Sequence, residues 1–387
     1  MTRSPCPVCA GADTVAFLSR EAVPVHQNLL APTRAAALGA VRGELAFAAC
    51  DSCGFVFNAA FDARKLSYGA GYDNNQTHSH FFADYLAALA RRLVDQEGIR
   101  NRRIVEVGCG QGQFLRLLVA DSAHGNTGVG FDPSYAGPDI ACDGRLRFER
   151  RLYDASASGE PADIVICRHV IEHVARPLEL LEAIGAALRS SPSPRVFFET
   201  PCVEWILEND VIWDFFYEHC SLFAPASLRT AFERAGFAVR SIEHAFGGQY
   251  LWAEAGLGGA RATPHADAAG IPAMATRFAM AERRLRDDWS RRIGDLARSG
   301  KVAIWGAGAK GVTFAQLVDP DCALVDCLVD LNPNKQGKFT PGTGHPIVGV
   351  SELASRGITH AILMNPNYRA ENEALLAREN ARVELID

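Results

Sequence analysis

A glycine-rich turn between a buried strand and a helix constrains the fold of this chain more than any other stretch. Residues 104–107 are apolar apart from one acid and predict a buried strand, and the apolar residues Phe114 to Leu118 predict the helix that follows. The glycines of the turn are Gly108, Gly110 and Gly112. Glycine allows a sharp turn and close approach of a ligand, which the unpaired N–H groups of the helix N-terminus attract. The stretch therefore predicts a Rossmann-like α/β domain with a ligand at the carboxyl edge of its sheet.

Two acids accompany this turn. Glu106 lies near the end of the first strand, and Asp132 ends the next predicted strand, residues 128–131. An acid at the second position can accept hydrogen bonds from ribose hydroxyls. The pattern E-x-G-x-G-x-G followed by such an acid resembles the class I S-adenosylmethionine-dependent methyltransferases. The resemblance implies that Glu106, Asp132 and the three glycines bind that cofactor, and the alternative is an ordinary Rossmann-like turn without it.

The composition indicates a cytoplasmic enzyme that acts on a small molecule. The chain has 387 residues, which predicts two or three domains, and its net charge of −6 argues against a nucleic-acid partner. It contains no apolar run long enough to cross a bilayer, and its first six residues contain no apolar signal segment. We therefore expect no membrane partner, and both a monomer and a dimer stay open.

Four of the eleven cysteines form two C-x-x-C pairs near the N-terminus. The pairs are Cys6 with Cys9 and Cys50 with Cys53. Each pair can present two thiolates to one side, and disulfides are rare in the cytoplasm, so the four sulfur atoms predict a tetrahedral zinc site. Because no coordination position is left open, the zinc is expected to be structural; the alternative is four unrelated buried cysteines. The other seven cysteines lack such pairing and are expected in the core.

A polar, aromatic stretch at residues 68–80 precedes a predicted helix at residues 81–96, whose apolar residues recur at helical spacing. Tyr72 and Gln76 lie in this stretch. A flexible polar segment ahead of a cofactor domain can fold over the site as a lid, or it can be only a linker. Both interpretations stay open.

Two histidines follow the strand predicted at residues 163–167. Arg168 and His169 come directly after this strand, and His173 lies four residues beyond His169, which puts the two rings on one face of a helix. Open α/β sheets bind ligands beyond the carboxyl ends of their strands, which favours a functional role. The alternatives are a core histidine that caps the next helix and a metal pair, for which the sequence offers no third ligand.

A loop at residues 213–223 combines groups suited to proton transfer. Tyr217, Glu218 and His219 are consecutive, and they offer a hydroxyl donor, an orienting carboxylate and an imidazole that titrates near neutral pH. His219 is therefore the predicted general base, and Glu218 is expected to orient its ring. Tyr217 or His173 would stabilise the anion that forms. The alternative is a cluster that caps the following helix.

Five motifs occur in order along the chain: the two C-x-x-C pairs, E-V-G-C-G-Q-G, R-H-V-I-E-H, E-T-P and Y-E-H-x-x-x-F. This order resembles the three-part sugar C-methyltransferases over essentially the whole chain. The best-known members methylate C3 of a thymidine-diphosphate-linked 4-keto amino sugar. The resemblance implies that His219 removes the proton next to the ketone and that Glu218 and His173 lie beside the sugar. It also implies that Tyr72 and Gln76 belong to the segment that covers the site, with Tyr72 acting in catalysis.

Three further assignments follow the same resemblance. Gln76, Arg168 and His169 are assigned to the cofactor site, and His169 also to the substrate site together with Phe216. The chain departs from the family at two of these positions, since some members have asparagine at the position of His169 and a tyrosine at the position of Phe216. Both positions face the sugar in the resemblance, so the departures bear on the exact substrate.

A second glycine turn predicts another Rossmann-like domain. Residues 301–305 predict a strand, residues 306–311 form a G-x-G-x-x-G turn, and Asp330 ends the next strand at the spacing of a ribose-binding acid. Taken alone, this turn predicts NAD and an oxidoreductase, although no hydride-transfer constellation follows. In the related methyltransferases this domain helps to hold the sugar nucleotide, and a repeat that only packs is the third interpretation.

Four residues of this region are assigned to the substrate. Lys310 lies near a helix N-terminus, where it suits a diphosphate, and Lys338 belongs to a basic, turn-rich loop that can close on the same phosphates. Asn367 and Tyr368 follow a later strand. A long helix from about Met274 to Leu296 is expected to act as a spacer ahead of this domain.

Together these features predict an α/β protein with three domains. They are a small zinc-binding domain with the lid segment (1–75), a class I methyltransferase Rossmann-like core (76–255) and a second, C-terminal Rossmann-like, substrate-binding domain (256–387). The predicted function is S-adenosylmethionine-dependent methylation of a carbon next to the carbonyl of a nucleotide-diphosphate-linked keto sugar. The alternatives are methylation of carbon, oxygen or nitrogen in another natural product and an NAD-dependent oxidation.

Overall fold

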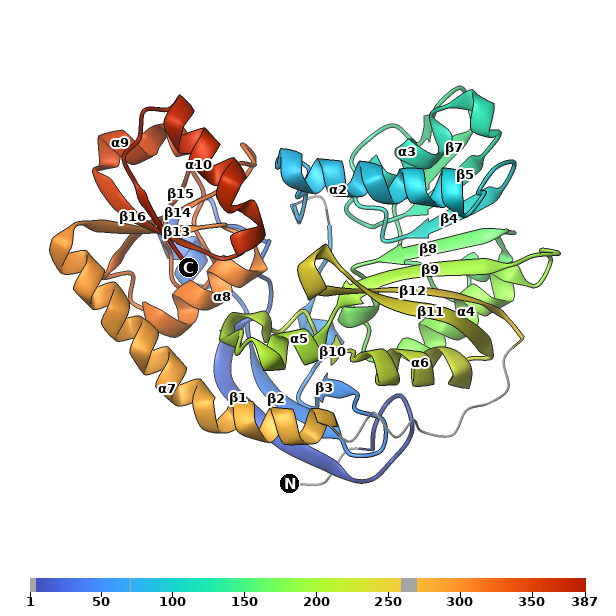
Figure 1. Cartoon of the computed structure of the whole chain (residues 1–387), viewed down its shortest axis with the longest axis horizontal. Coiled ribbons are helices and arrows are strands. Elements are labelled where there is room, and N and C mark those ends of the chain that lie inside the picture. The colour runs from blue at the N-terminus through green and yellow to red at the C-terminus, as the bar shows by residue number, and fades with distance from the viewer. Residues whose placement is uncertain (1–4, 70, 259–269) are drawn as a thin grey trace.

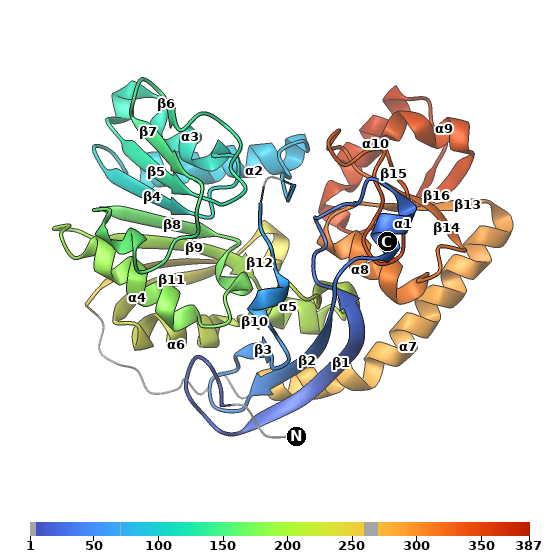
Figure 2. The same cartoon turned by 180° about the vertical axis from the view of Figure 1, so that it is seen from behind.

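The central sheet has eight strands in the order β11-β12-β9-β8-β4-β5-β7-β6. The computed structural model describes residues 5–69, 71–258 and 270–387 (Figures 1 and 2). The strands of this sheet are β4 (Arg103–Val107), β5 (Thr127–Phe131), β6 (Ile140–Ala141), β7 (Leu146–Glu149), β8 (Ile164–Arg168), β9 (Arg195–Pro201), β11 (Phe237–Ala245) and β12 (Tyr250–Leu257). The strands from β7 to β9 are parallel, and β12 runs antiparallel between β9 and β11. The predicted Rossmann-like core is confirmed.

The first strand of this core is buried on both faces. Ile104, Val105 and Val107 of β4 are almost completely inaccessible, as expected for a parallel strand with helices on either side. The helices of this part are α2 (His80–Arg91), α3 (Gln113–Val119), α4 (Pro177–Leu188), α5 (Val203–Glu208) and α6 (Pro225–Arg234). The strand order reverses between β4 and β8, which is where open α/β sheets form ligand sites.

The N-terminal sheet contains a strand from the central part of the chain. Its order is β1-β2-β3-β10, with β1 (Thr14–Pro24), β2 (Arg42–Cys50), β3 (Val56–Asn58) and β10 (Ser221–Leu222), and it carries the short helix α1 (Arg34–Leu38). Ser221 pairs with Phe57 and Leu222 with Val56. Because β10 directly follows the predicted base loop, the N-terminal sheet fixes one end of that loop.

The C-terminal sheet is wholly parallel, in the order β15-β14-β13-β16-β17. Its strands are β13 (Lys301–Trp305), β14 (Val325–Val329), β15 (Ile347–Val348), β16 (Ile358–Leu363) and β17 (Glu384–Ile386), and its helices are α8 (Ala309–Val318), α9 (Leu353–Arg356) and α10 (Arg369–Arg378). The glycine turn joins the middle strand β13 to α8, so the second predicted Rossmann-like fold is confirmed.

The long helix α7 (Gly270–Ser299) connects the parts of the molecule. It contacts β1, β2, α5, β13 and α8, and it runs beneath the N-terminal sheet to the C-terminal one (Figure 1). The predicted spacer helix is confirmed and is longer than expected. Arg20 of β1 pairs with Glu282 of α7 at 3.1 Å and donates to the carbonyl oxygen of Phe215 at 2.9 Å. One apolar core, containing Phe47, Phe215 and Val302, joins the N-terminal and C-terminal sheets.

No helix within the described residues is both long enough and apolar enough to span a membrane.

Candidate active site

A cavity of about 250 Å³ lies where the three sheets meet. Its wall combines the loop after β1, the stretch 72–79, the carboxyl edge of the central sheet and the glycine turn of the C-terminal sheet. The residues that line it and that are discussed below are Asn28, Tyr72, Gln76, His169, Glu172, His173, Asp214, Phe216, Glu218, His219, Gln249, Gly308, Lys310, Asp330, Lys335, Asn365 and Tyr368. Residues more than 300 positions apart in the chain thus face one space.

His219 lines this cavity among other rings. Its ring centroid lies 4.0 Å from that of Phe216 and 4.8 Å from that of His173. Burial lowers the pKa of His219 well below its usual range, and the nearby positive charges of His173, His169 and Lys310 lower it further. The imidazole is therefore neutral at pH 7 and has a lone pair to accept a proton.

Tyr217 does not face the cavity, which corrects its predicted role as an anion stabiliser. Its side chain is fully buried, and its hydroxyl accepts from the N–H of Asp62 at 2.9 Å and donates to the carbonyl oxygen of Asp62 at 3.2 Å. The ring packs against Gly43, where an added Cβ would lie 2.2 Å from it. Tyr217 therefore fastens the base loop to the N-terminal sheet.

Glu218 lines the cavity but does not orient His219, which corrects a second expectation. One carboxylate oxygen accepts a hydrogen bond from Nδ1 of His26 at 3.0 Å, and the other accepts from the N–H of Gln27 at 2.9 Å. Both donors belong to the loop after β1. Tyr72, from the stretch 72–79, lies near this carboxylate, and burial together with the Glu218 charge raises its pKa well above the usual range.

Charged side chains alternate beneath the cavity at the end of β8. Arg168 pairs with Glu199 at 2.7 Å, and His169 lies 3.4 Å from both Glu199 and Glu172. Burial lowers the pKa of His169, but the two carboxylates outweigh it and raise the pKa to about 9. Arg168 is buried in this ion pair and stacks on Phe114. Its assignment to the cofactor site stays a prediction, whereas His169, with φ of 53°, lines the cavity.

The two histidines of the R-H-V-I-E-H motif do not form the metal pair that the spacing allowed. His173 instead lies beside His219 and Glu172, and donor atoms of these three residues are within 4.8 Å of one another. Nδ1 of His173 is 3.3 Å from the hydroxyl of Tyr68, and Glu172 also accepts from Thr200 at 3.1 Å. Local spacing does not predict this grouping, because its members come from two loops.

The glycine turn after β4 has the backbone that a bound nucleoside needs. Gly108, Gly110 and Gly112 all have positive φ, at 69°, 54° and 76°. The space beside Gly110 is open, whereas a Cβ at Gly112 would lie 2.5 Å from the Phe148 ring. The turn thus leaves a cradle at Gly110 and is closely packed behind it, so it fits an adenosine cofactor.

The two predicted acids of this turn already have protein partners. Asp132 accepts from the N–H of Gly110 at 2.9 Å with one oxygen and from the N–H and hydroxyl of Ser134 at 2.8 and 2.6 Å with the other. Glu106 is buried and accepts from the N–H of Leu115 at 3.1 Å, and burial raises its pKa to about 8. Both acids therefore hold the turn and the following helix in place.

The C-terminal turn uses the same arrangement and faces the cavity. Asp330 accepts from the N–H of Ala307 at 3.0 Å and, with its other oxygen, from the N–H of Asn332 at 2.9 Å. Gly306 has φ of 118°, and a Cβ on Gly311 would lie 1.8 Å from the Gly306 carbonyl oxygen. The third glycine of the G-x-G-x-x-G motif is thus required for close packing of α8 on the turn.

Two lysines, Lys310 and Lys338, were predicted to contact the substrate, and the structure separates them. Lys310 lines the cavity and pairs with Asp214 at 3.0 Å. Lys338 does not line it, whereas Lys335 of the same loop does, with its ammonium 3.2 Å from Asn28 and from the Ala307 carbonyl oxygen. Lys335 was missed because its position depends on these partners rather than on local charge.

Of the two candidates after β16, only one lines the cavity. Tyr368 does so, whereas Asn367 donates instead to the carbonyl oxygen of Phe246 at 3.3 Å. Asn365 takes the place predicted for Asn367 and exchanges two hydrogen bonds with Gln249, at 3.0 and 3.1 Å.

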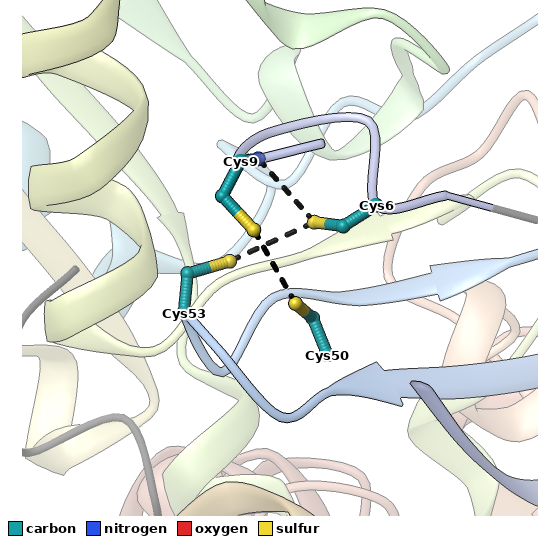
Figure 3. Close-up of side chains that lie close together, drawn as sticks. All are labelled: Cys6, Cys9, Cys50 and Cys53. Atoms are coloured by element: carbon teal, nitrogen blue, oxygen red, sulfur yellow. Dashed lines mark hydrogen bonds between the residues drawn. The ribbon is translucent and has the colours of Figure 1, made fainter. Parts of the chain in front are cut away.

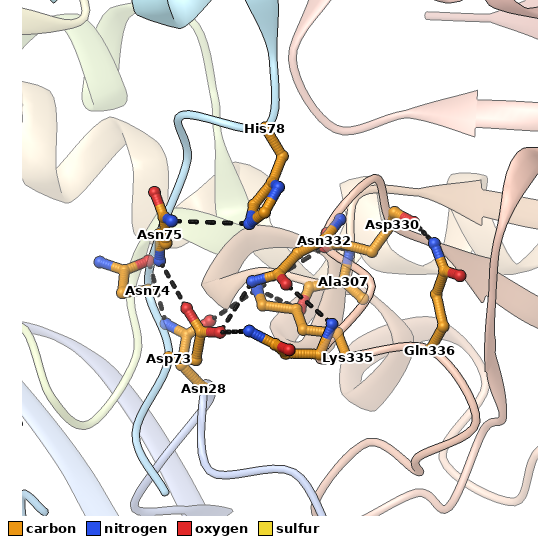
Figure 4. A network of polar contacts seen from close by, with 11 residues as sticks. Asn28, Asp73, Asn74, Asn75, His78, Ala307, Asp330, Asn332, Lys335 and Gln336 are labelled. Atoms are coloured by element: carbon orange, nitrogen blue, oxygen red, sulfur yellow. Dashed lines mark hydrogen bonds and ion pairs between the residues drawn. The ribbon is translucent and has the colours of Figure 1, made fainter. Parts of the chain in front are cut away.

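The stretch 72–79 closes one side of the cavity and is fastened to the C-terminal part. Asp73 accepts from Asn332 at 2.9 Å (Figure 4) and from Asn334 at 3.3 Å. In addition, Glu371 accepts from the hydroxyl of Ser79 at 2.5 Å. Tyr72 and Gln76 both face the cavity. The position of this stretch favours the lid interpretation over a plain linker.

The four N-terminal cysteines converge as predicted (Figure 3). Sγ of Cys6 lies 3.6 Å from that of Cys53, and Sγ of Cys9 lies 3.4 Å from that of Cys50, with all four within 4.8 Å of one another. Hydrogen bonds from Cys53 and Cys6 lower the pKa of Cys50. Four sulfur donors at this spacing fit a tetrahedral zinc ion with no open position.

Comparisons with known proteins show methyltransferases among the relatives of this chain. The model of a methyltransferase domain matches residues 75–242, and that of a C-methyltransferase C-terminal domain matches residues 265–382. The C-methyltransferase NovU of Streptomyces niveus is 24% identical over 390 residues, which cover 95% of this chain and 90% of the relative. The ubiquinone biosynthesis O-methyltransferase of Aeromonas salmonicida is 27% identical over 161 residues, covering 38% of this chain and 66% of the relative. A solved S-adenosylmethionine-dependent methyltransferase from Mesorhizobium loti covers 44% of this chain and 99% of its own at 18% identity, with a TM-score of 0.33.

Proposed function

The chain belongs to the S-adenosylmethionine-dependent C-methyltransferases, and on that premise we propose that it methylates a carbon next to the carbonyl of a nucleotide-diphosphate-linked keto sugar. One observation carries this proposal. The neutral imidazole of His219 and the glycine turn of the C-terminal sheet line a single cavity. A base and an anion-binding turn facing one space suit a substrate that has an acidic C–H bond at one end and phosphates at the other.

The turn after β4 is the proposed cofactor site. Gly110 would leave room for the cofactor, and the N–H groups at the start of α3 would face it. When bound, S-adenosylmethionine supplies a methyl group on a sulfonium, which is a good leaving group. The chain itself then has to bring the substrate carbon close and to make it nucleophilic.

His219 is the proposed base for this activation. It takes the proton from the carbon next to the carbonyl, and the electron pair of the broken C–H bond forms an enolate. His173 lies beside His219 and Tyr72 lines the same cavity, and these two residues are the proposed donors to the enolate oxygen. The enolate carbon would then be the nucleophile for the methyl group that bound S-adenosylmethionine would supply, with the thioether sulfur as the leaving group, and the imidazolium of His219 returns its proton to solvent.

The nucleotide diphosphate is proposed to lie against the C-terminal turn. Lys310 and Lys335 provide two cations on this side of the cavity, and the N-terminus of α8 adds unpaired N–H groups. The NAD-dependent alternative is based on this same glycine turn. Against that alternative, the ammonium of Lys335 lies 3.6 Å from a carboxylate oxygen of Asp330, where the ribose of NAD would have to bind.

A second candidate substrate follows from Phe216. This ring stacks on His219 and supplies no hydroxyl to the cavity wall, so an apolar part of a different natural product would suit that position. The four cysteines are proposed to hold a structural zinc ion that stabilises the loops at the start of the chain and after β2.

Calorimetric titration with S-adenosylhomocysteine, thymidine diphosphate and NAD tests these proposals together. Micromolar binding of the first two without NAD would support the sugar-nucleotide substrate. Binding of S-adenosylhomocysteine alone would keep the methyltransferase and move the substrate to another natural product. Binding of NAD but not of S-adenosylhomocysteine would overturn the proposal.

A further inference from the structure

Three consecutive residues of the loop after β1 are polar and yet buried. His26, Gln27 and Asn28 are 6, 2 and 3% exposed. Burying polar side chains costs free energy unless they form hydrogen bonds, so their partners indicate why this loop is built as it is. His26 and Asn28 have their partners outside the N-terminal sheet, in the base loop, in residues 67–74 and in the C-terminal part. The side chain of Gln27 donates to the carbonyl oxygen of Pro24 in β1, whereas its backbone N–H reaches the base loop.

The hydrogen bonds of His26 determine its protonation. Nε2 accepts from the N–H of Ser67 at 3.0 Å, so this nitrogen carries no proton. Nδ1, which lies 3.0 Å from a carboxylate oxygen of Glu218, must then carry the proton and donate it. His26 therefore links the N–H of Ser67, ahead of the covering stretch, to the Glu218 carboxylate with one defined ring orientation.

Gln27 supplies the second hydrogen bond to the Glu218 carboxylate. Its backbone N–H donates to the second carboxylate oxygen at 2.9 Å. Glu218 is 1% exposed and lines the cavity, and both its oxygens are bound by donors almost 200 residues earlier in the chain. Hydrogen bonds to a charged group are stronger and more directional than neutral ones. The orientation of this carboxylate is thus set by the N-terminal loop and not by its neighbour His219.

Asn28 orients the ammonium of Lys335 (Figure 4), just as His26 and Gln27 orient the Glu218 carboxylate. Its side-chain oxygen accepts from the ammonium of Lys335 at 3.2 Å, while its nitrogen donates to Asn74 at 3.4 Å. Lys335 is 5% exposed and lines the cavity beside the C-terminal turn. A flexible lysine held between Asn28 and the Ala307 carbonyl oxygen is ordered before a ligand arrives.

We propose that the segment His26–Asn28 of the N-terminal sheet is a positioning element of the active site, which fixes the Glu218 carboxylate toward the sugar and the Lys335 ammonium toward the phosphates. This inference rests on the proposed function, since it assigns both groups to the same substrate. It gives the zinc-binding part of the chain a role in turnover as well as in stability. The segment acts through Glu218 and Lys335 and does not touch the reacting atoms.

Two substitutions of His26 separate positioning from packing. His26→Asn places an amide nitrogen near the position of Nδ1 and keeps the donor to Glu218, whereas His26→Gln places its amide near Nε2 and loses that donor. The test measures kcat and KM with a thymidine-diphosphate-linked 4-keto sugar, together with the melting temperature of each zinc-loaded protein. We expect His26→Gln to lower kcat/KM at least tenfold with little change in melting temperature. His26→Asn should recover most of that loss.

A double substitution shows whether His26 acts through Glu218. If it does, His26→Gln combined with Glu218→Gln will be no slower than Glu218→Gln alone. Substitutions of Asn28 test whether it positions Lys335. Asn28→Ala should weaken thymidine diphosphate binding about tenfold, whereas Asn28→Asp, which keeps an oxygen acceptor for Lys335, should not.

The outcomes distinguish this inference from the proposed function. If the wild-type enzyme turns over the keto sugar while both His26 variants match it, or fall together with their melting temperatures, the positioning role is overturned and the function stands. Losses that add in the double variant would also overturn it. If the wild-type protein methylates no keto sugar, the proposed function fails, and the positioning role fails with it.

Discussion

Substituting Gly311 by alanine tests the packing of the C-terminal turn. The added Cβ would lie 1.8 Å from the Gly306 carbonyl oxygen, which is backbone and cannot rotate away. Overpacking of this kind costs about 1–3 kcal/mol, and a backbone contact this close belongs at the upper end, about 3 kcal/mol. Alanine gains up to about 1 kcal/mol over glycine in a helix, which leaves a net loss of about 2 kcal/mol. For the C-terminal domain, a loss of about 2 kcal/mol in unfolding free energy corresponds to a fall in melting temperature of roughly 8 °C.

Gly308 provides the matched control, because it belongs to the same motif but faces the cavity. No atom lies within 4 Å of a Cβ added there, and its φ of −91° suits any residue. We expect Gly308→Ala to melt within about 2 °C of the wild type, since it creates no clash. It should nevertheless weaken thymidine diphosphate binding, because the methyl group enters ligand space. Scanning calorimetry and titration calorimetry of both variants give the result; equal melting temperatures for the two would refute the packing argument.

Three further predictions concern pH, zinc and the base loop. The lowered pKa of His219 keeps this base neutral on the acid side, so kcat/KM should hold below pH 6.5; a profile with an acid limb at or above pH 6.5 would contradict this expectation. Chelation of the metal should lower the melting temperature and turnover and leave S-adenosylhomocysteine binding in place, and metal analysis should find one zinc per chain; full activity without zinc would contradict the link between this site and the base loop. Tyr217→Phe should lose about 1–3 kcal/mol of unfolding free energy, since the N–H of Asp62 loses its partner, with kcat unchanged; a large fall in kcat at unchanged stability would restore Tyr217 to a catalytic role.

The strands, the two glycine turns and the cysteine cluster could be predicted because their signals are local. An apolar run, a run of alternating glycines and a C-x-x-C pair each report a structure formed within a few residues. The acids Asp132 and Asp330 were also found at the correct strand ends. Their side chains hold the turns, however, and sequence spacing cannot distinguish an acid that binds its own backbone from one that binds a ribose.

The roles of single side chains in the cavity could not be predicted, because their partners are distant in the chain. Tyr217 and Glu218 are adjacent to His219, yet their hydrogen bonds go to Asp62 and His26, more than 150 residues away. Lys335 and Lys338 have similar local surroundings, and only the contact with Asn28 selects Lys335. Adjacency in a motif indicates which residues reach a site but not which of them face it.

Hydrogen–deuterium exchange into the substrate tests the central claim most directly. A thymidine-diphosphate-linked 4-keto sugar is incubated with the protein in D₂O without cofactor, and deuterium next to the carbonyl is followed by NMR. The account predicts enzyme-dependent exchange that falls at least about 100-fold in His219→Asn, with S-adenosylhomocysteine binding retained. Exchange at the wild-type rate in His219→Asn would contradict the assignment of the base.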